Sequence, residues 1–294
     1  MFALLGPNGA GKTTTVEILE GHRTKSAGEV SVLGYDPAKH ERAFRQRIGI
    51  VLQETGVEPF LTVAEAVELY RGYYPSPRPL DEIIEVVGLT EKRDSRINKL
   101  SGGQQRRLDV AIGLAGDPDL LFLDEPTTGF DPSARRAAWQ LVHNLRALGK
   151  TVFLTTHYMD EAQNLAGRVA IIVAGKIVAG GTPESLILEN PAQTKITFAL
   201  PDGSIDLSPA LRAAASSVNG KVLMQTDEPM RLLHELTGWA IDEKIELGEL
   251  SVARPTLEDV YLSLTGGAGA EVKPDEAGAE SRKGSGRAGR RGRR

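Results

Sequence analysis

The chain has 294 residues, 40% hydrophobic and 25% charged, a composition that excludes a mostly disordered protein. It holds no cysteine, which excludes disulfide scaffolds and cysteine nucleophiles, and its apolar runs are far shorter than the about 20 residues of a membrane-spanning helix. The net charge of −4 is uneven, because residues 266–294 hold eight Lys and Arg against four Asp and Glu, while the first 265 hold 27 against 35.

The first elements predicted are a strand, a glycine-rich loop and a helix. Phe2–Leu5 is a short apolar run, Gly6–Gly11 holds three glycines, and a helical pattern runs from Lys12 to about Glu20. Glycines let backbone N–H groups point at a polyanion, and the helix adds the positive end of its dipole. The pattern predicts a phosphate-binding loop in which Lys12 bridges the β- and γ-phosphates and Thr13 is a ligand of Mg²⁺.

Further strands are predicted at Glu29–Leu33 and Ile48–Leu52. From about 54 to 101 the pattern is instead helical, with segments at Val63–Tyr73 and Leu80–Val87. A strand-poor insert within alternating strands and helices predicts a helical subdomain.

A helix is predicted to begin at Ser101, directly after this insert. Ser101 and Gln104 fit a capping box, and Gly102 and Gly103 leave the first N–H groups unobstructed. Such a helix start is a second candidate anion site, and a simple capped helix is the alternative.

The next predicted strand, Leu120–Leu123, ends in the two carboxylates Asp124 and Glu125. Ligands of parallel sheets bind beyond the carboxyl ends of the strands, so Asp124 is expected near a metal ion at the mouth of the loop. Glu125 is expected to face an attacking water as a general base. An acid at the end of a buried strand is by itself common.

The remaining part of the sheet is predicted from alternating helices and strands. Asp131 and Pro132 look like the N-cap and first residue of a helix, and Thr151–Leu154 and Val169–Val173 look like buried strands. His157 follows the first of these strands, a position that is more often structural than functional. Together the elements predict an α/β fold with a mainly parallel sheet and helices on both faces.

Residues 191–265 are predicted to form a small α+β domain, and residues 266–294 a disordered basic tail. The predicted elements of the domain are two strands, a short helix and a final helix that opens with a capping box: Lys195–Leu200, Ile245–Val252, Met230–Leu236, and Thr256 to Asp259.

The order of these motifs resembles that of the nucleotide-binding ATPase subunits of ABC transporters. Six elements follow the family order, namely the Walker A loop, Q-loop, signature, Walker B strand, D-loop and switch histidine, at Gly6–Thr13, Gln53, Leu100–Gln104, Leu120–Glu125, Gly129–Asp131 and His157. The resemblance covers about residues 1–190 and implies a P-loop NTPase (RecA-like) ATPase domain with its helical subdomain at about 54–101. Residues 190–265, which end in Pro255-Thr-Leu-Glu-Asp-Val-Tyr-Leu, look like the C-terminal region of antibiotic-resistance exporter subunits of the daunorubicin type.

The resemblance implies an Mg²⁺-dependent ATPase that works as two copies, with each ATP held by one subunit's Walker A loop and the other's signature. Glu125 would polarise water, His157 and Lys12 would contact the γ-phosphate, and Asp131 would couple the two sites. Contact with the nucleotide is implied for Gly6, Pro7, Asn8, Gly9, Ala10, Gly11, Lys12, Thr13, Thr14, Gln53, Ser101, Gly102, Gly103 and Gln104. Ligation of Mg²⁺ is implied for Thr13, Gln53 and Asp124.

The resemblance also implies a separate membrane permease, touched by the helical insert, at the cytoplasmic face of the cell membrane. The expected work is export of a drug- or antibiotic-like small molecule. A soluble ABC ATPase acting on ribosomes or DNA is the alternative, disfavoured by the single cassette and the lack of heptads. No specific nucleic acid is expected as a partner, and the basic tail is either a contact for anionic lipid or a solvated end.

The start of the chain departs from the family pattern. Only Met1 to Leu5 precede Gly6, whereas family members carry further strands there and an aromatic residue that stacks on adenine. We therefore expect a reading frame that begins too late, a strand Phe2–Leu5 that loses neighbours, and a doubtful adenine site. A catalytically defective subunit is a further alternative. Phe130 stands where leucine is commoner.

Overall fold

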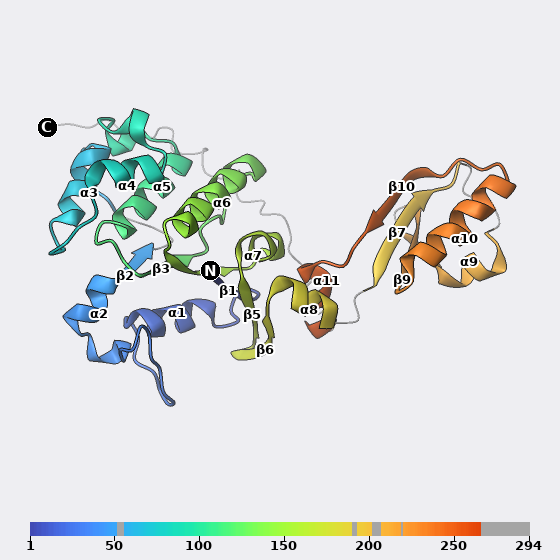
Figure 1. The fold of residues 1–294 in the computed structure, drawn as a ribbon, viewed down its shortest axis with the longest axis horizontal. Coiled ribbons are helices and arrows are strands. Elements are labelled where there is room, and N and C mark those ends of the chain that lie inside the picture. The colour runs from blue at the N-terminus through green and yellow to red at the C-terminus, as the bar shows by residue number, and fades with distance from the viewer. Residues whose placement is uncertain (52–55, 190–192, 202–206, 219, 266–294) are drawn as a thin grey trace, which may run out of the picture.

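The computed structural model describes residues 1–51, 56–189, 193–201, 207–218 and 220–265. Two parts are seen in Figure 1, a larger body built on one sheet and a smaller unit beside it. None of the helices in the described ranges combines the length and the apolar character that crossing a bilayer requires.

The larger body is built on a six-stranded sheet with the order β2-β3-β4-β1-β5-β6. All neighbouring strands are parallel except β5 and β6. Their bounds are β1 Phe2–Leu5, β2 Ile48–Val51, β3 Leu120–Asp124, β4 Thr151–Thr156, β5 Arg168–Val173 and β6 Lys176–Gly181. The predicted mainly parallel α/β sheet is thus confirmed. The expectation that the first strand loses neighbours is wrong, because β1 pairs with β4 on one side and β5 on the other.

Helices cover both faces of this sheet because alternate strand residues point to opposite sides. On one face, Leu120 and Phe122 pack with Val16 and Phe44, which come from α1 (Lys12–Glu20) and α2 (Arg42–Arg47). On the other face, Leu121 and Leu123 belong to the main core together with residues of three helices, α5 (Gly102–Gly113), α6 (Pro132–Ala147) and α7 (Met159–Leu165). The loops at the carboxyl ends of the strands are thereby held between two packed layers.

The strand expected at Glu29–Leu33 is absent from the structure. That segment forms only an isolated bridge between Val32 and Tyr35, in a turn against the core face of α1 and α2. A strand needs a hydrogen-bonded neighbour, and none of the described residues pairs with this segment beyond that bridge.

The described residues from 56 to 101 contain helices and no strand. They comprise α3 Val63–Arg71, α4 Leu80–Val86 and two short 3-10 helices, Thr90–Lys92 and Ile97–Lys99; a further 3-10 helix, Pro37–Lys39, precedes α2. Helix α3 opens with a capping box between Thr62 and Glu65. Gln53, the predicted Q-loop residue, lies outside the described residues.

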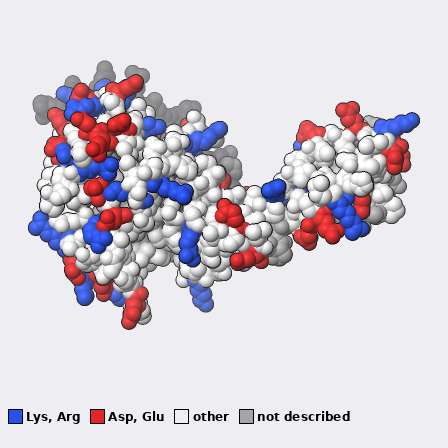
Figure 2. Space-filling view, in the orientation of Figure 1, with Lys and Arg blue, Asp and Glu red and all other residues white. Residues whose placement is uncertain are grey.

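The smaller unit holds an antiparallel four-stranded sheet, in the order β10-β7-β9-β8, with its own core around Phe198 and Met224. Its elements are β7 Thr194–Ala199, α9 Pro209–Ala214, β8 Ala215–Val218, β9 Lys221–Thr226, α10 Pro229–Asp242 and β10 Gly248–Ala253. In Figure 2 this unit stands apart from the body, with acidic and basic side chains interspersed over the visible face.

The last helix, α11 (Leu257–Thr265), returns to the larger body. It packs on α7 and on α8 (Pro183–Glu189), and its Leu257, Val260 and Tyr261 belong to the main core. The capping box expected at Thr256 and Asp259 is present. The domain limits at 190 and 265 remain predictions, and the predicted disordered tail lies outside the described residues.

Candidate nucleotide site

The phosphate-binding loop lies between β1 and α1, at the carboxyl end of the sheet. Gly11 begins α1 with a φ of 103°, a left-handed conformation that favours glycine, and no side chain caps the helix. A Cβ at Gly6 would lie 2.4 Å from the carbonyl oxygen of Ile172, so only glycine fits there. The loop therefore approaches the sheet closely and leaves the first N–H groups of α1 without a side-chain partner.

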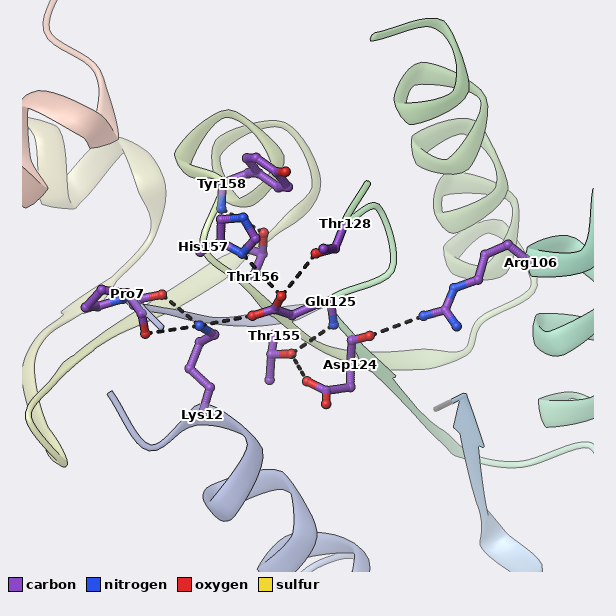
Figure 3. A network of polar contacts seen from close by, with 11 residues as sticks. Pro7, Lys12, Arg106, Asp124, Glu125, Thr128, Thr155, Thr156, His157 and Tyr158 are labelled. Carbon is purple, nitrogen blue, oxygen red and sulfur yellow. Dashed lines mark hydrogen bonds and ion pairs between the residues drawn. The ribbon is translucent and has the colours of Figure 1, made fainter. Parts of the chain in front are cut away.

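Lys12 is buried, and its ammonium group is held by three acceptors (Figure 3). Its Nζ donates to the carbonyl oxygens of Gly6 at 2.9 Å and Pro7 at 3.2 Å, and it lies 3.1 Å from Oε1 of Glu125. The ammonium thus sits over the loop, where it faces the carboxylates at the end of β3.

Asp124 and Glu125 are fixed by the neighbouring strand β4. The Thr155 hydroxyl donates to Oδ1 of Asp124 and accepts from the backbone N–H of Glu125 at 3.0 Å. On the other side, Arg106 of α5 donates to the carbonyl oxygen of Asp124 at 3.2 Å. The two carboxylates are therefore positioned by contacts to both their strand neighbour and the signature helix.

Glu125 stands at the centre of the polar network in Figure 3. Its backbone has a φ of 43°, in the left-handed region, which turns the chain sharply after the strand. Oε2 accepts from the Thr128 hydroxyl at 3.0 Å and lies 3.2 Å from Nδ1 of His157. The His157 imidazole, more than the Lys12 ammonium, lowers the pKa of the Glu125 carboxyl to about 2, against partial burial, which raises it. The carboxylate is thus ionised and fully engaged by its neighbours.

A cavity of about 390 Å³ opens in front of these groups, and we call it the loop cavity. Its lining residues are Asn8, Gly9, Gly11, Lys12, Thr13, Thr14, Asp124 and Glu125. The structure therefore brings the predicted loop and both Walker B carboxylates to one hollow. His157 reaches it through Glu125.

The loop cavity offers oxygen donors that suit Mg²⁺. The exposed Thr13 hydroxyl and the Asp124 carboxylate line the same hollow, and hard oxygen ligands are what Mg²⁺ prefers. Within the described ranges, His, Asp and Glu form no group of three that could hold a metal without further ligands. The donor set fits an ion that is completed by phosphate and water, as Mg²⁺ usually is.

The predicted signature lies at a different hollow. Ser101 and Gln104 form the expected capping box that opens α5. A second cavity of about 400 Å³, the signature cavity, is lined by Gly102, Phe130 and Thr128 among others, and Glu125 is the residue it shares with the loop cavity. The structure thus does not bring the signature residues Ser101 to Gln104 to the loop cavity of their own chain.

Four side chains of this site were missed by sequence reasoning. Arg106, Thr128 and Thr155 position the two carboxylates, and the Tyr158 ring lies at a tilt against that of His157, with ring centroids 4.1 Å apart. Each lies within two residues of a motif residue, so a polar or aromatic side chain close to a motif was the available signal. Asp131 caps α6 through its contacts to the N–H groups of Ser133 and Ala134, as its sequence position predicted.

Comparisons with known proteins agree with this geometry. A family model described as ABC transporter matches residues 1–128, and one described as the C-terminal domain of ABC transporter domain-containing protein-like proteins matches residues 194–256. Nod factor export ATP-binding protein I of Burkholderia pseudomallei (strain 1710b) is 39% identical over 274 residues, covering 90% of this chain and 88% of that protein. The protein of the same name from Rhizobium johnstonii is 38% identical over 273 residues, covering 90% and 86%.

Solved structures show the same fold. A dimeric ATP-binding cassette in a post-hydrolysis state, bound to ADP and Pi, is 27% identical with a TM-score of 0.54, covering 62% of this chain and 84% of that one. The ATP binding subunit of an ABC transporter is 26% identical with a TM-score of 0.56, covering 64% and 81%. The predicted P-loop NTPase fold is confirmed, while the finer likeness to daunorubicin-type subunits stays a prediction. The chain belongs to the ATP-binding proteins of ABC transporters, and it binds ATP with Mg²⁺ and hydrolyses it.

Proposed function

We propose that two copies of this chain enclose two ATP molecules and power export through a separate membrane permease. The observation that carries this proposal is the cluster of Lys12, Glu125 and His157 at the loop cavity. In this cluster a phosphate-binding cation and an imidazole each contact the same carboxylate directly.

Lys12 is the group that binds the β- and γ-phosphates in this proposal. Its three acceptors in the structure are two carbonyl oxygens and one carboxylate oxygen, all of which phosphate oxygens can replace. Thr13, Asp124 and, outside the described residues, Gln53 would hold Mg²⁺, which neutralises charge on the phosphates. The remaining loop residues supply backbone N–H groups to the same oxygens.

Glu125 polarises the attacking water. A carboxylate whose pKa is about 2 is a weak proton acceptor, so its partners must first be drawn away. Phosphate oxygens that take over the Lys12 ammonium remove one of the charges that keep this pKa low. Nucleotide binding therefore activates the base, and His157, freed in part from Glu125, can contact the γ-phosphate.

The second copy is required because of where the signature lies. Ser101, Gly102 and Gly103 line no part of the loop cavity of their own chain, so the γ-phosphate there stays open on one side. The signature of a facing copy would close it, and Asp131 would couple the two sites. The dimeric cassette among the solved structures supports an assembly of this kind.

Export through a permease is supported by the relatives, which are named Nod factor export ATP-binding proteins. We assign the chain a peripheral place at the cytoplasmic face of the cell membrane, with the helical insert against the permease. A drug- or antibiotic-like small molecule remains the expected cargo, and vesicles that contain the permease partner test it.

The test of the site is Glu125→Gln. This variant keeps the shape of the side chain but removes the base, so we expect an ATP-bound dimer with turnover reduced at least about 100-fold. Size-exclusion chromatography with and without ATP, together with phosphate release, measures both effects. Wild-type turnover in this variant would refute the assignment of Glu125, and a monomer at saturating ATP would refute the shared site.

A further inference from the structure

Glu161, in the first turn of α7, is a fully buried carboxyl group, with a relative exposure of 0%. Neither of its side-chain oxygens has a hydrogen-bond partner among the described residues. The Thr127 hydroxyl and the Trp139 indole N–H are likewise buried and without partners in the described chain. Polar groups without partners are rare in a protein core, so their presence at one place calls for a physical reason.

The groups that surround this carboxyl come from three separate segments. Thr127 belongs to the loop after β3, Thr156 is the last residue of β4, and Trp139 lies in α6. Helix α7 packs on both α6 and β4. Burial raises the pKa of Glu161, while the nearby side chains of Thr156, Thr127 and Trp139 lower it in part, although none of them lies in hydrogen-bonding geometry with its oxygens. The two oxygens of a carboxyl group together have enough acceptor sites for two hydroxyls and an N–H at once.

Two of these segments lead directly to the catalytic carboxylate. Thr127 precedes Thr128, whose hydroxyl donates to Oε2 of Glu125 at 3.0 Å. Thr156 precedes His157, whose Nδ1 lies 3.2 Å from the same oxygen. Both contacts to Oε2 are thus made by residues next in sequence to groups that face Glu161.

We propose that Glu161 is a positioning residue that holds Glu125 in place for hydrolysis, acting through Thr127 and Thr156. The inference rests on the proposed function, because it requires Glu125 to be the group that polarises water. Lys12, which contacts the other oxygen of Glu125, is held instead by the carbonyl oxygens of Gly6 and Pro7. Glu161 therefore governs the rate of hydrolysis and not the affinity for nucleotide.

The test compares Glu161→Leu with Glu161→Gln. Leucine fills the buried space without polar contacts, whereas glutamine keeps the shape and can still donate and accept. We expect Glu161→Leu to lower kcat about 10- to 100-fold with KM for MgATP unchanged, because a small displacement of a catalytic group has that effect. Glu161→Gln should restore most of the rate. Phosphate release, binding of a fluorescent ATP analogue and thermal unfolding are the measurements.

Leu165→Ala is the matched control. Leu165 lies one turn after Glu161 in the same helix and is 1% exposed in the main core, and its side chain has no polar group. This variant should lower Tm and leave kcat unchanged below Tm. Equal loss of kcat in Leu165→Ala and Glu161→Leu would show that α7 only needs to be stable, and would overturn the proposal.

Failure of the positioning role can be distinguished from failure of the proposed function. Glu125→Gln is assayed beside the others, and full turnover in that variant would overturn the function itself. Loss of turnover in Glu125→Gln with wild-type kcat in Glu161→Leu would overturn the positioning role alone. If Glu161→Leu does not fold, Thr127→Val and Trp139→Phe each remove one of the polar groups near Glu161 instead. A lower kcat at constant KM in either supports the role, and unchanged kcat in both contradicts it.

Discussion

Two helices of this chain begin with glycine-rich turns, and they begin in opposite ways. Helix α1 starts at Gly11 without a side-chain cap. Helix α5 starts at Ser101, whose hydroxyl accepts from Gln104 N–H at 3.3 Å and whose own N–H donates to the Gln104 side chain at 2.9 Å. An uncapped start leaves its N–H groups to a ligand, whereas a capping box satisfies two donors within the chain.

This difference suits two separate tasks. The start of α1 lies in the loop cavity with Lys12 and two carboxylates, so it can hold phosphate without help. The start of α5 is closed by its own capping box and lines the signature cavity through Gly102. It is therefore suited to complete the nucleotide site of a facing copy. Substitutions at either helix start therefore test this comparison.

The largest effect is expected from Lys12→Ala, which removes the only cation that lines the loop cavity in the described structure. ATP binding should weaken at least about 100-fold, because the phosphates lose their charge-assisted contact with the ammonium group. In addition, the partly buried Glu125 carboxylate loses one of the cations that balance its charge. Titration with a fluorescent ATP analogue measures the change. Lys25→Ala is the control, since Lys25 is paired with Asp36 at 3.0 Å, outside the cavity. Unchanged binding by Lys12→Ala would remove the basis for assigning phosphate to α1.

The next effect concerns acid stability on the α1 side. The pKa of Glu125 is lowered from 4.5 to about 2, so its ionised form stabilises the folded state above about pH 4.5. That contribution is lost as the pH falls from 4.5 towards 2. It is on the order of 2 kcal/mol after allowance for solvent screening.

Glu125→Gln lacks this contribution, while every other carboxylate is the same in both proteins. The free energy of unfolding, measured in urea between pH 5 and pH 2.5 (about the range in which the group titrates), should fall more steeply for the wild type. If the free energy of unfolding fell with pH equally in both proteins, the Lys12–Glu125–His157 cluster would not contribute to stability.

Local signals in the sequence were sufficient for most of the fold. Short apolar runs marked five of the six strands of the larger sheet, β1 to β5, because a strand buried on both faces is apolar throughout. Strand β6 was missed because most of its residues are exposed and it has no such run. Capping boxes at Ser101 and Thr256 were also read correctly, because each one is decided by residues three apart. The failure at Glu29–Leu33 has the opposite cause, since pairing depends on a distant neighbour.

The contacts of the site depend on tertiary structure in the same way. Motif spacing located Lys12, Glu125 and His157, but the ion contacts among them follow from the sharp turn at Glu125 and from the order of β1, β3 and β4. Glu161 was overlooked because a glutamate in a short helix is normally exposed. The return of α11 to the main core also escaped, because its apolar face gives no information about which core it joins.

Ser101→Ala tests the α5 side of the comparison. It removes the capping hydroxyl, which should cost about 1 kcal/mol of stability. Turnover should fall about 10-fold, since a helix start that completes the facing site is loosened, while binding of ATP to the isolated chain stays unchanged.

Thr62→Ala provides the matched control, because α3 opens with the same kind of capping box. Glu65 N–H donates to the Thr62 hydroxyl at 3.2 Å, and Thr62 lines neither the loop cavity nor the signature cavity. Loss of the Thr62 hydroxyl should lower Tm about as much as Ser101→Ala does, with turnover unchanged. Weaker ATP binding in Ser101→Ala would mean that α5 contacts nucleotide in its own chain, contrary to the comparison.

The smallest effect is expected from Arg106→Lys, which changes a contact between α5 and the Walker B strand of the same chain. Arg106 of α5 donates to the carbonyl oxygen of Asp124 at 3.2 Å and lies 3.8 Å from Asp109, so it connects the signature helix to the Walker B strand. Arg106→Lys keeps the charge but loses the planar fork that reaches both partners. We expect kcat to fall about twofold to fivefold at constant ATP affinity, the equivalent of one hydrogen bond of about 1 kcal/mol or less.

Arg107→Lys is the comparison for that measurement, because the neighbouring Arg107 donates instead to the carbonyl oxygen of Gly88 at 3.3 Å, away from the carboxylates. It should leave kcat unchanged. If Arg106→Lys changes the affinity for ATP instead of kcat, the contact between Arg106 and Asp124 affects the geometry of the loop cavity. Binding of ATP at the start of α1 would then depend on α5. If both variants have the same kcat, the contact between Arg106 and Asp124 does not couple α5 to the Walker B strand. The starts of α1 and α5 are then coupled only through the facing copy.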